Sequence, residues 1–146
     1  MKINQVLTSI LTVFAFGAAI LANAQIMQSD TMSSVLQSTK LIAVGAPTTG
    51  TLEIVKSANG NRVLNLKNIK TEAGPDLHVY LYAGNIPSKE AKNIKTVKYV
   101  DLGKLAAPFK GNYSYKIPAN TNLEQFKSVV IWCDVAKVTF AGAKLK

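Results

Sequence analysis

Polar and apolar residues alternate with a period of two over several short stretches, which is the spacing of strands that bury one face. In residues 77–82 one face is aliphatic and the other is aromatic and amphipathic: Leu77, Val79 and Leu81 against His78, Tyr80 and Tyr82. Residues 113–117 alternate in the same way before Pro118, which cannot donate a hydrogen bond within a central ladder. Both stretches are predicted to be strands.

Two apolar runs, residues 52–55 and 63–66, flank the dipeptide Asn59-Gly60. Asn and Gly tolerate positive φ, so this segment is typical of a tight β-hairpin. Residues 96–103 are predicted to form a further strand. The run richest in β-branched and aromatic residues, 128–140, is predicted to be one long strand.

These short strands, separated by turn signals and without an amphipathic helix of any length, predict an all-β, antiparallel β-sandwich. Residues 25–44 begin with a polar stretch that has no sustained period, so they are expected to be an N-terminal tether or a frayed segment. The sandwich domain is therefore expected to occupy residues 45–146.

Residues 1–24 have the features of a secretory signal peptide: a basic start at Lys2, an apolar run over residues 6–21, and small residues at Ala22 and Ala24. Cleavage is expected after Ala24. The apolar run is shorter than the roughly 20 residues that a spanning helix needs. The sequence thus predicts a secreted or periplasmic protein with no transmembrane segment after signal removal.

The formal net charge is +9, and lysine supplies every basic residue except Arg62. Such a surplus favours attraction to anionic surfaces, although lysine also solvates exposed faces and sheet edges. One polar connection carries a cluster of lysines: Lys89, Lys92, Lys95 and Lys98. Nucleic acid is not expected as a partner, because the arginines and interleaved exposed aromatic residues typical of such interfaces are missing.

Cys133 is the only cysteine of the chain, and it lies in the most apolar predicted strand. With period two, this strand has an aliphatic face and a mixed face: Val129, Ile131, Cys133 and Val135 against Val130, Trp132 and Asp134. A free cysteine commonly behaves as a small buried hydrophobe. In an oxidising compartment, however, an unpaired thiol is open to disulfide exchange unless it is buried. A core thiol and a functional thiol both remain as hypotheses.

Known types of cysteine site narrow the functional alternatives. A structural zinc site needs four nitrogen or sulfur ligands, a blue-copper site needs two histidines, and an iron-sulfur cluster needs several thiolates. The chain has one cysteine and one histidine, so no metal site is predicted. Three roles for the cysteine remain: a redox-active thiol, an intermolecular disulfide that links a dimer, and an axial thiolate ligand to a non-covalent haem.

His78 is a second candidate, as a base for the Cys133 thiol with Asp76 orienting its imidazole. The alternative is that Asp76 belongs to a turn at residues 74–76 and bonds to the local backbone. Trp132 and Tyr80 are candidates for binding a flat cofactor or a sugar, although aromatic residues at strand spacing also pack across strands.

Three segments, in this order and spacing, resemble the DM-thirteen domain, also called the electron-transfer DM domain: TEAGPDLHVYLYAG, YVDLGKLAAPFKGNYSYKIP and FKSVVIWCDVAKVTFAGAKL. The resemblance covers roughly residues 45–145. Two motifs of the family are matched. The first is at Gly74, Pro75, Asp76 and Leu77, and the second is at Asp101, Leu102 and Gly103. The chain departs from many bacterial relatives at Asp134, where they carry a basic residue.

The resemblance implies a β-sandwich in which Cys133 serves redox chemistry, either as a thiol or by holding a group such as haem. An electron carrier is expected rather than a turnover enzyme, with a redox protein or a cell-envelope protein as its partner. The alternative is a non-catalytic secreted interaction or adhesion module that binds a glycan, a protein or an anionic surface, with Cys133 as core packing. A thiol enzyme using Cys133 and His78 is a third hypothesis, for which the chain has no known nucleophile signature.

Overall fold

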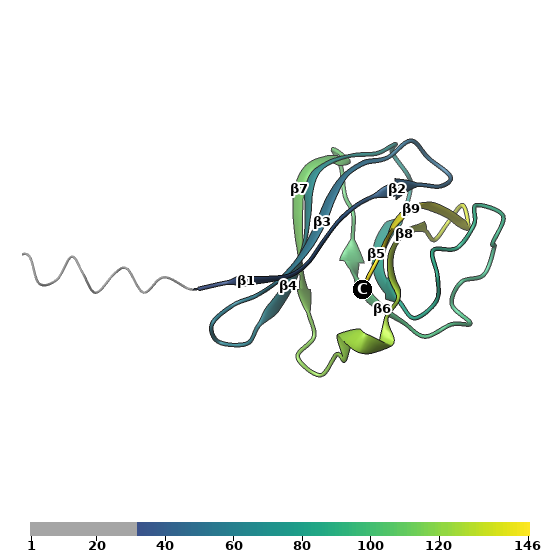
Figure 1. The fold of residues 1–146 in the computed structure, drawn as a ribbon. Coiled ribbons are helices and arrows are strands. Elements are labelled where there is room, and N and C mark those ends of the chain that lie inside the picture. The colour runs from purple at the N-terminus through teal and green to yellow at the C-terminus, as the bar shows by residue number, and fades with distance from the viewer. Residues whose placement is uncertain (1–31) are drawn as a thin grey trace, which may run out of the picture. The chain divides into compact units, whose positions relative to one another are not determined.

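Two antiparallel sheets face each other across an apolar core in the computed structural model, which describes residues 32–146 (Figure 1). This arrangement confirms the predicted all-β sandwich. The signal peptide expected at residues 1–24 lies outside the described residues. Within residues 32–146, no helix has the length and apolar character needed to cross a membrane.

The four-stranded sheet, sheet A, has the order β1 (Ser34–Lys40), β3 (Thr49–Lys56), β4 (Arg62–Lys70) and β7 (Lys110–Ile117). The five-stranded sheet, sheet B, has the order β2 (Ile42–Ala43), β9 (Val138–Lys144), β8 (Ser128–Cys133), β5 (Leu77–Tyr82) and β6 (Tyr99–Lys104). A short 3₁₀ turn, η1 (Leu123–Gln125), precedes β8. Every strand pair is antiparallel, as expected from the hairpin signals.

The hairpin predicted at Asn59-Gly60 is formed by β3 and β4, with Lys56 opposite Arg62 and Leu52 opposite Leu66. Gly60 has a φ of 88°, a conformation that glycine adopts without steric cost. The hairpin prediction is therefore confirmed.

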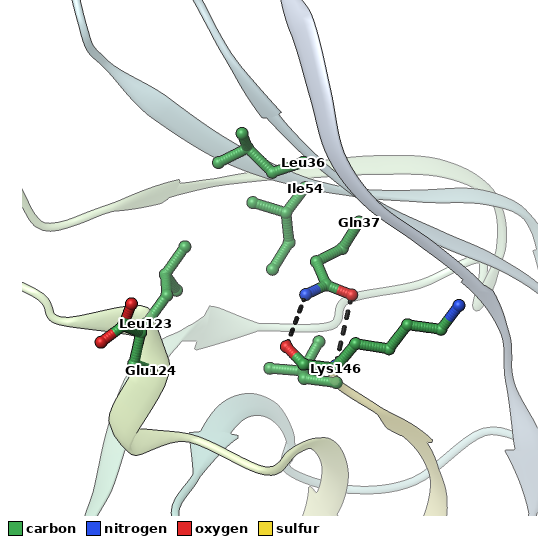
Figure 2. A pocket seen from close by; sticks show the side chains of 7 residues that line it. Leu36, Gln37, Ile54, Leu123, Glu124 and Lys146 are labelled. Atoms are coloured by element: carbon green, nitrogen blue, oxygen red, sulfur yellow. Dashed lines mark hydrogen bonds between the residues drawn. The ribbon is translucent and has the colours of Figure 1, made fainter.

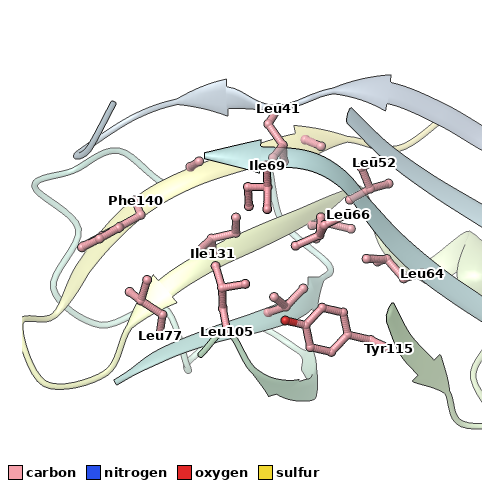
Figure 3. Packing of buried hydrophobic residues seen from close by; sticks show 14 of the residues in the cluster. Leu41, Leu52, Leu64, Leu66, Ile69, Leu77, Leu105, Tyr115, Ile131 and Phe140 are labelled. Atoms are coloured by element: carbon pink, nitrogen blue, oxygen red, sulfur yellow. The ribbon is translucent and has the colours of Figure 1, made fainter. Parts of the chain in front are cut away.

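The core lies between the sheets and is built from the inward face of each strand, as period two requires (Figure 3). The predicted aliphatic faces of β5 and β8 both point into it: Leu77, Val79, Leu81, Val129, Ile131 and Cys133. Sheet A contributes the matching buried side chains: Leu52, Ile54, Leu64, Leu66 and Ile69.

The outward face of sheet B carries a second, smaller apolar cluster. It combines side chains of β5 and β8 with Ile94 from the connection between β5 and β6: Tyr80, Tyr82, Val130, Trp132 and Ile94. That connection, residues 83–98, runs along the side of sheet B remote from sheet A (Figure 1). The aromatic face predicted for residues 77–82 is thus buried under a loop.

Residues 128–140 do not form one strand, which corrects the sequence-based prediction. β8 ends at Cys133, residues 134–137 form a turn, and β9 starts at Val138. The backbone N–H of Lys137 donates to the carbonyl of Cys133 at 2.9 Å and closes the turn. The position of positive φ in this turn is taken by Lys137, at 54°, and not by the glycine that usually marks such a turn in a sequence. Val135, predicted on the same face as Cys133, is 66% exposed in the turn.

Residues 34–40 form β1, within the segment 25–44 for which the sequence predicts a tether or a frayed segment. β1 is an edge strand paired with β3, and most of its side chains are exposed on both faces. A register shift between Val35 and Gln37 also interrupts its alternation. An edge strand with so little burial has no strong period-two pattern, which explains why the sequence does not reveal it.

Because β8 ends before the turn at 134–137, truncating Ile131 and truncating Val135 are expected to affect stability very differently. Ile131→Ala removes a fully buried side chain and is expected to lower the free energy of unfolding by about 2–5 kcal/mol. Val135→Ala truncates an exposed side chain and is expected to change it by less than about 0.5 kcal/mol. Urea unfolding of both variants measures this, and a comparable loss for Val135→Ala would contradict the turn.

Candidate functional site

Cys133 is the last residue of β8 and is fully buried, with 0% of its surface exposed. It lies opposite Leu77 of β5 and Val138 of β9. Directly paired residues of adjacent strands point to the same face, so these two side chains flank the thiol on the core side. The thiol is therefore part of the apolar core, as the hypothesis of a core cysteine requires.

The Cys133 sulfur nevertheless lies next to the turn that leads out of the core. The backbone N–H of Ala136 donates a hydrogen bond to Sγ over 3.5 Å. Residues 135–137 are all exposed. The turn backbone thus covers the sulfur on one side, and water is on the outer side of that turn.

The packing around Cys133 does not fit a haem bound through its sulfur. An axial thiolate needs an open space on the iron side, whereas this side chain is enclosed by aliphatic groups and its sulfur already accepts an N–H. Trp132 and Tyr80, the other residues predicted to hold a cofactor, lie on the outward face of sheet B. Sheet B separates them from the thiol, so these three side chains do not line one pocket.

His78 is opposite Trp132, on the outward face, whereas Cys133 is opposite Leu77, on the inward face. The imidazole and the thiol are therefore on opposite sides of the same sheet. The arrangement of a thiol nucleophile and its base is not assembled between Cys133 and His78.

His78 instead belongs to a polar network on the outward face. Its Nδ1 lies 2.8 Å from Oδ2 of Asp101, and its Nε2 lies 3.3 Å from Oδ1 of Asp76. The carboxylate expected to orient the imidazole is thus present, together with a second one. Lys104 Nζ lies 3.0 Å from Asp76 and is the main reason why the pKa of Asp76 is lowered.

Asp134, which directly follows β8, is a further carboxylate of this network. Its carboxylate accepts hydrogen bonds from Lys95 at 2.7 Å, from Lys137 at 3.0 Å and from the indole N–H of Trp132 at 3.3 Å. The bond from Lys95 is the largest cause that holds the pKa of Asp134 well below its usual range, followed by the bond from Lys137. The carboxylate in turn raises the pKa of Lys95.

Two aromatic rings adjoin the network. The Tyr80 and Tyr99 rings are 4.9 Å apart between centroids, and Lys95 Nζ lies 5.9 Å from the centre of the Tyr80 ring. Burial raises the pKa of Tyr80 to about 12, so this phenol is neutral at physiological pH. A cavity of about 370 Å³ opens beside the network and is lined by the loop and by residues of the β8–β9 hairpin: Lys92, Asn93, Ile94, Lys95, Trp132, Asp134 and Lys137.

The first sequence motif leads into β5, with only Leu77 in the strand, and the second motif lies within the neighbouring strand β6. The Asp101 carboxylate accepts the backbone N–H of Gly103 at 2.9 Å and contacts His78. Gly103 takes a φ of 135°, next to a register shift between Val79 and Tyr80. The motif glycine therefore permits the bulge, and the motif aspartates at 76 and 101 hold the imidazole between them.

Another concave region lies where β1, β3, η1 and the C-terminal residues meet (Figure 2). It has a volume of about 190 Å³ and is largely apolar, with contributions from Leu36, Ile54, Leu123 and Leu145. The Gln37 side chain exchanges two hydrogen bonds with the backbone of Lys146 across it. None of the residues predicted to be functional lines this region.

The pattern along the chain does not connect Asp134, Lys95 and Lys104 with His78. One signal in the sequence points to two of these residues, because charged side chains stand at strand ends. Lys104 ends β6, and Asp134 follows β8. Only the order of strands in sheet B brings these ends beside His78, and that order does not follow from the pattern along the chain.

The low pKa of Asp134 predicts how stability depends on pH. Its contribution is fully present above the unfolded pKa of about 4 and is lost as pH falls through the lower folded pKa. Asp134→Asn is therefore expected to lower the free energy of unfolding, on the order of 1 kcal/mol, near neutral pH, and by less below about pH 4. Urea midpoints of both proteins over pH 2–7 measure this, with Glu90→Gln in the exposed loop as the control. A deficit that stays constant over the range would contradict the assignment.

Comparison with known proteins identifies the family of this chain. Residues 40–145, which include every strand of sheet B and most of sheet A, match the family model described as Electron transfer DM13. No curated protein and no solved structure matches the chain significantly. The match spans well over half of the sequence and includes Cys133, both motifs and the outward network. The chain therefore belongs to the electron transfer DM13 family.

Proposed function

We propose that this protein is an exported electron-transfer domain in which the Cys133 thiol is the group that is oxidised and reduced. The family assignment supports electron transfer in general terms. The features of residues 1–24 support export. Cys133 is the chain's only cysteine, so any thiol chemistry of the domain takes place at this sulfur.

The observation that carries the proposal is the contact between Sγ of Cys133 and the backbone N–H of Ala136. It places the sulfur beneath a four-residue turn whose outer side faces water, not in the middle of the sheet. Rotation of this turn away from the core would expose Sγ without separating the paired strands β5 and β8. Local openings of this kind require much less free energy than global unfolding.

The chemistry that suits a lone thiol is exchange with a partner that supplies a disulfide. The Cys133 thiolate attacks one sulfur of the partner, a new S–S bond forms, and the other partner sulfur leaves as a thiolate with the electron pair of the broken bond. A thiolate of a separate dithiol donor then attacks Sγ of Cys133, and the first partner leaves as its second thiolate, fully reduced. The donor's other thiolate attacks the donor sulfur of the new mixed disulfide, which forms the donor disulfide and releases the Cys133 thiolate. Donor and acceptor must therefore each provide two sulfur atoms, because this chain has no second cysteine.

The burial of Cys133 favours a second candidate function, a non-catalytic interaction module. In that case the thiol is core packing, and binding would involve the exposed lysines of the loop over sheet B: Lys89, Lys92, Lys95 and Lys98. Binding to an anionic envelope polymer would then fall with rising salt and would not depend on Cys133.

Formation of a mixed disulfide with oxidised glutathione distinguishes the two candidates. The mature protein is incubated without denaturant, and the covalent adduct is followed by intact mass. The proposal predicts an adduct in the wild type that a dithiol reverses, and none in Cys133→Ser. Val129→Ala is the matched control, because it perturbs the same face of β8 and keeps the thiol.

An adduct that forms only where urea unfolds the protein would contradict the redox proposal and support the interaction module. Retention by an anionic polymer that is equal in the wild type and Cys133→Ser, and is lost in salt, would then identify the binding function.

A further inference from the structure

The outward network contains three side chains whose ligand atoms converge. One atom from each of Asp76, His78 and Asp134 lies within 4.8 Å of the others. All three are partly buried, with 15–25% of each side chain exposed. From this convergence we propose that Asp76, His78 and Asp134 form a binding site for a first-row divalent transition metal ion, and that Cu²⁺ binds there more tightly than Zn²⁺.

The site lies at one end of sheet B, where β5 begins and β8 ends. His78 is in β5 and Asp76 directly precedes this strand, with its carboxylate 3.3 Å from Nε2 of His78. Asp134 directly follows β8, and its backbone N–H donates to the carbonyl of Asp76 at 2.9 Å. This bond fixes the two carboxylate-bearing positions relative to each other. Ligands tied to strand ends in this way are positioned more accurately than ligands on a free loop.

The orientation of the imidazole points to a metal ligand. Asp101 makes the shorter of the two carboxylate contacts, to Nδ1 at 2.8 Å, and the Asp76 contact to Nε2 is 3.3 Å. In the tautomer that donates from Nδ1 to Asp101, the lone pair of Nε2 is on the side of Asp76 and can bind a metal ion. Metal-binding histidines typically carry such a partner on the nitrogen that does not bind the metal. Asp101 is not one of the three converging residues, so it is a positioning residue here.

The donor set selects the class of ion. One imidazole nitrogen with two carboxylates suits Cu²⁺ and Zn²⁺ better than Ca²⁺ or Mg²⁺, which prefer oxygen alone. The Irving–Williams order places Cu²⁺ above Zn²⁺ for a site of this kind. Water can complete the coordination, because all three side chains are partly exposed.

Three lysines compete with the metal for the carboxylates. Lys104 contacts Asp76, and Lys137 and Lys95 contact Asp134. The side chains of Lys104 and Lys137 are 70% and 53% exposed, so each can move into water when a cation replaces it. Their presence lowers the affinity, and removing one of them is expected to raise it. A purely structural ion-pair network predicts no such gain.

Titration with Cu²⁺ and with Zn²⁺ tests the proposal, using untagged mature protein in the Cys133→Ser background to exclude thiol chemistry. His78 is the only histidine, so its imidazole ¹⁵N resonances report on this site alone in the Zn²⁺ titration. Calorimetry is expected to show one ion per chain, with the lower Kd for Cu²⁺. His78→Gln is expected to weaken binding at least about 10-fold, and Asp101→Asn about 10- to 100-fold.

Lys104→Met is the decisive variant, because it removes an exposed side chain and is not expected to affect folding. It should lower the Kd several-fold, while Lys127→Met, an exposed lysine outside the network, should leave it unchanged. Three results would overturn the proposal: imidazole resonances that Zn²⁺ does not shift, Cu²⁺ binding that His78→Gln leaves intact, or a Kd that Lys104→Met does not lower.

Discussion

The antiparallel register of β5 against β8 determines which chemical groups of this domain can meet. Leu77 is opposite Cys133, and His78 is opposite Trp132. Because successive side chains of a strand alternate between faces, a shift of β8 by one residue would move the thiol to the outward face, which carries the imidazole. The buried aliphatic residues of β8 oppose that shift, since it would transfer Val129 and Ile131 to the outward face as well.

This register gives sheet B two separate environments. On the inward side, a single thiol is enclosed by aliphatic groups and touches a backbone N–H of the β8–β9 turn. On the outward side, an imidazole lies among carboxylates, with lysines and aromatic rings close by. The two environments meet at the 134–137 turn, because Asp134, a ligand of the proposed metal site, directly follows Cys133. The proposed redox role and the proposed metal site use different side chains, so Cys133→Ser and His78→Gln test them separately.

Local pattern predicts much of this fold. The period-two faces of residues 77–82 and 128–133, and the Asn59-Gly60 hairpin, depend on neighbours in sequence and appear as expected. The 134–137 turn was missed because Lys137 adopts positive φ without a glycine to announce it. β1 was missed because an exposed edge strand needs little hydrophobic alternation.

The site was less predictable than the fold. Burial of Cys133 follows from its aliphatic face, whereas its contact with Ala136 depends on the unexpected turn. The grouping of Asp76 with His78 could be proposed from their spacing. The addition of Asp101 and Asp134 requires the order of β6, β5 and β8, which only the packed sheet determines.

The central claim is that Cys133 becomes accessible through its turn while the sandwich remains folded. The most direct measurement is the rate of Cys133 labelling by a small thiol reagent as a function of urea below the unfolding midpoint. Opening of the turn exposes little surface, so the account predicts a rate that is nearly independent of urea. A rate that rises with the full urea dependence of global unfolding would contradict it and would make Cys133 an inert part of the core.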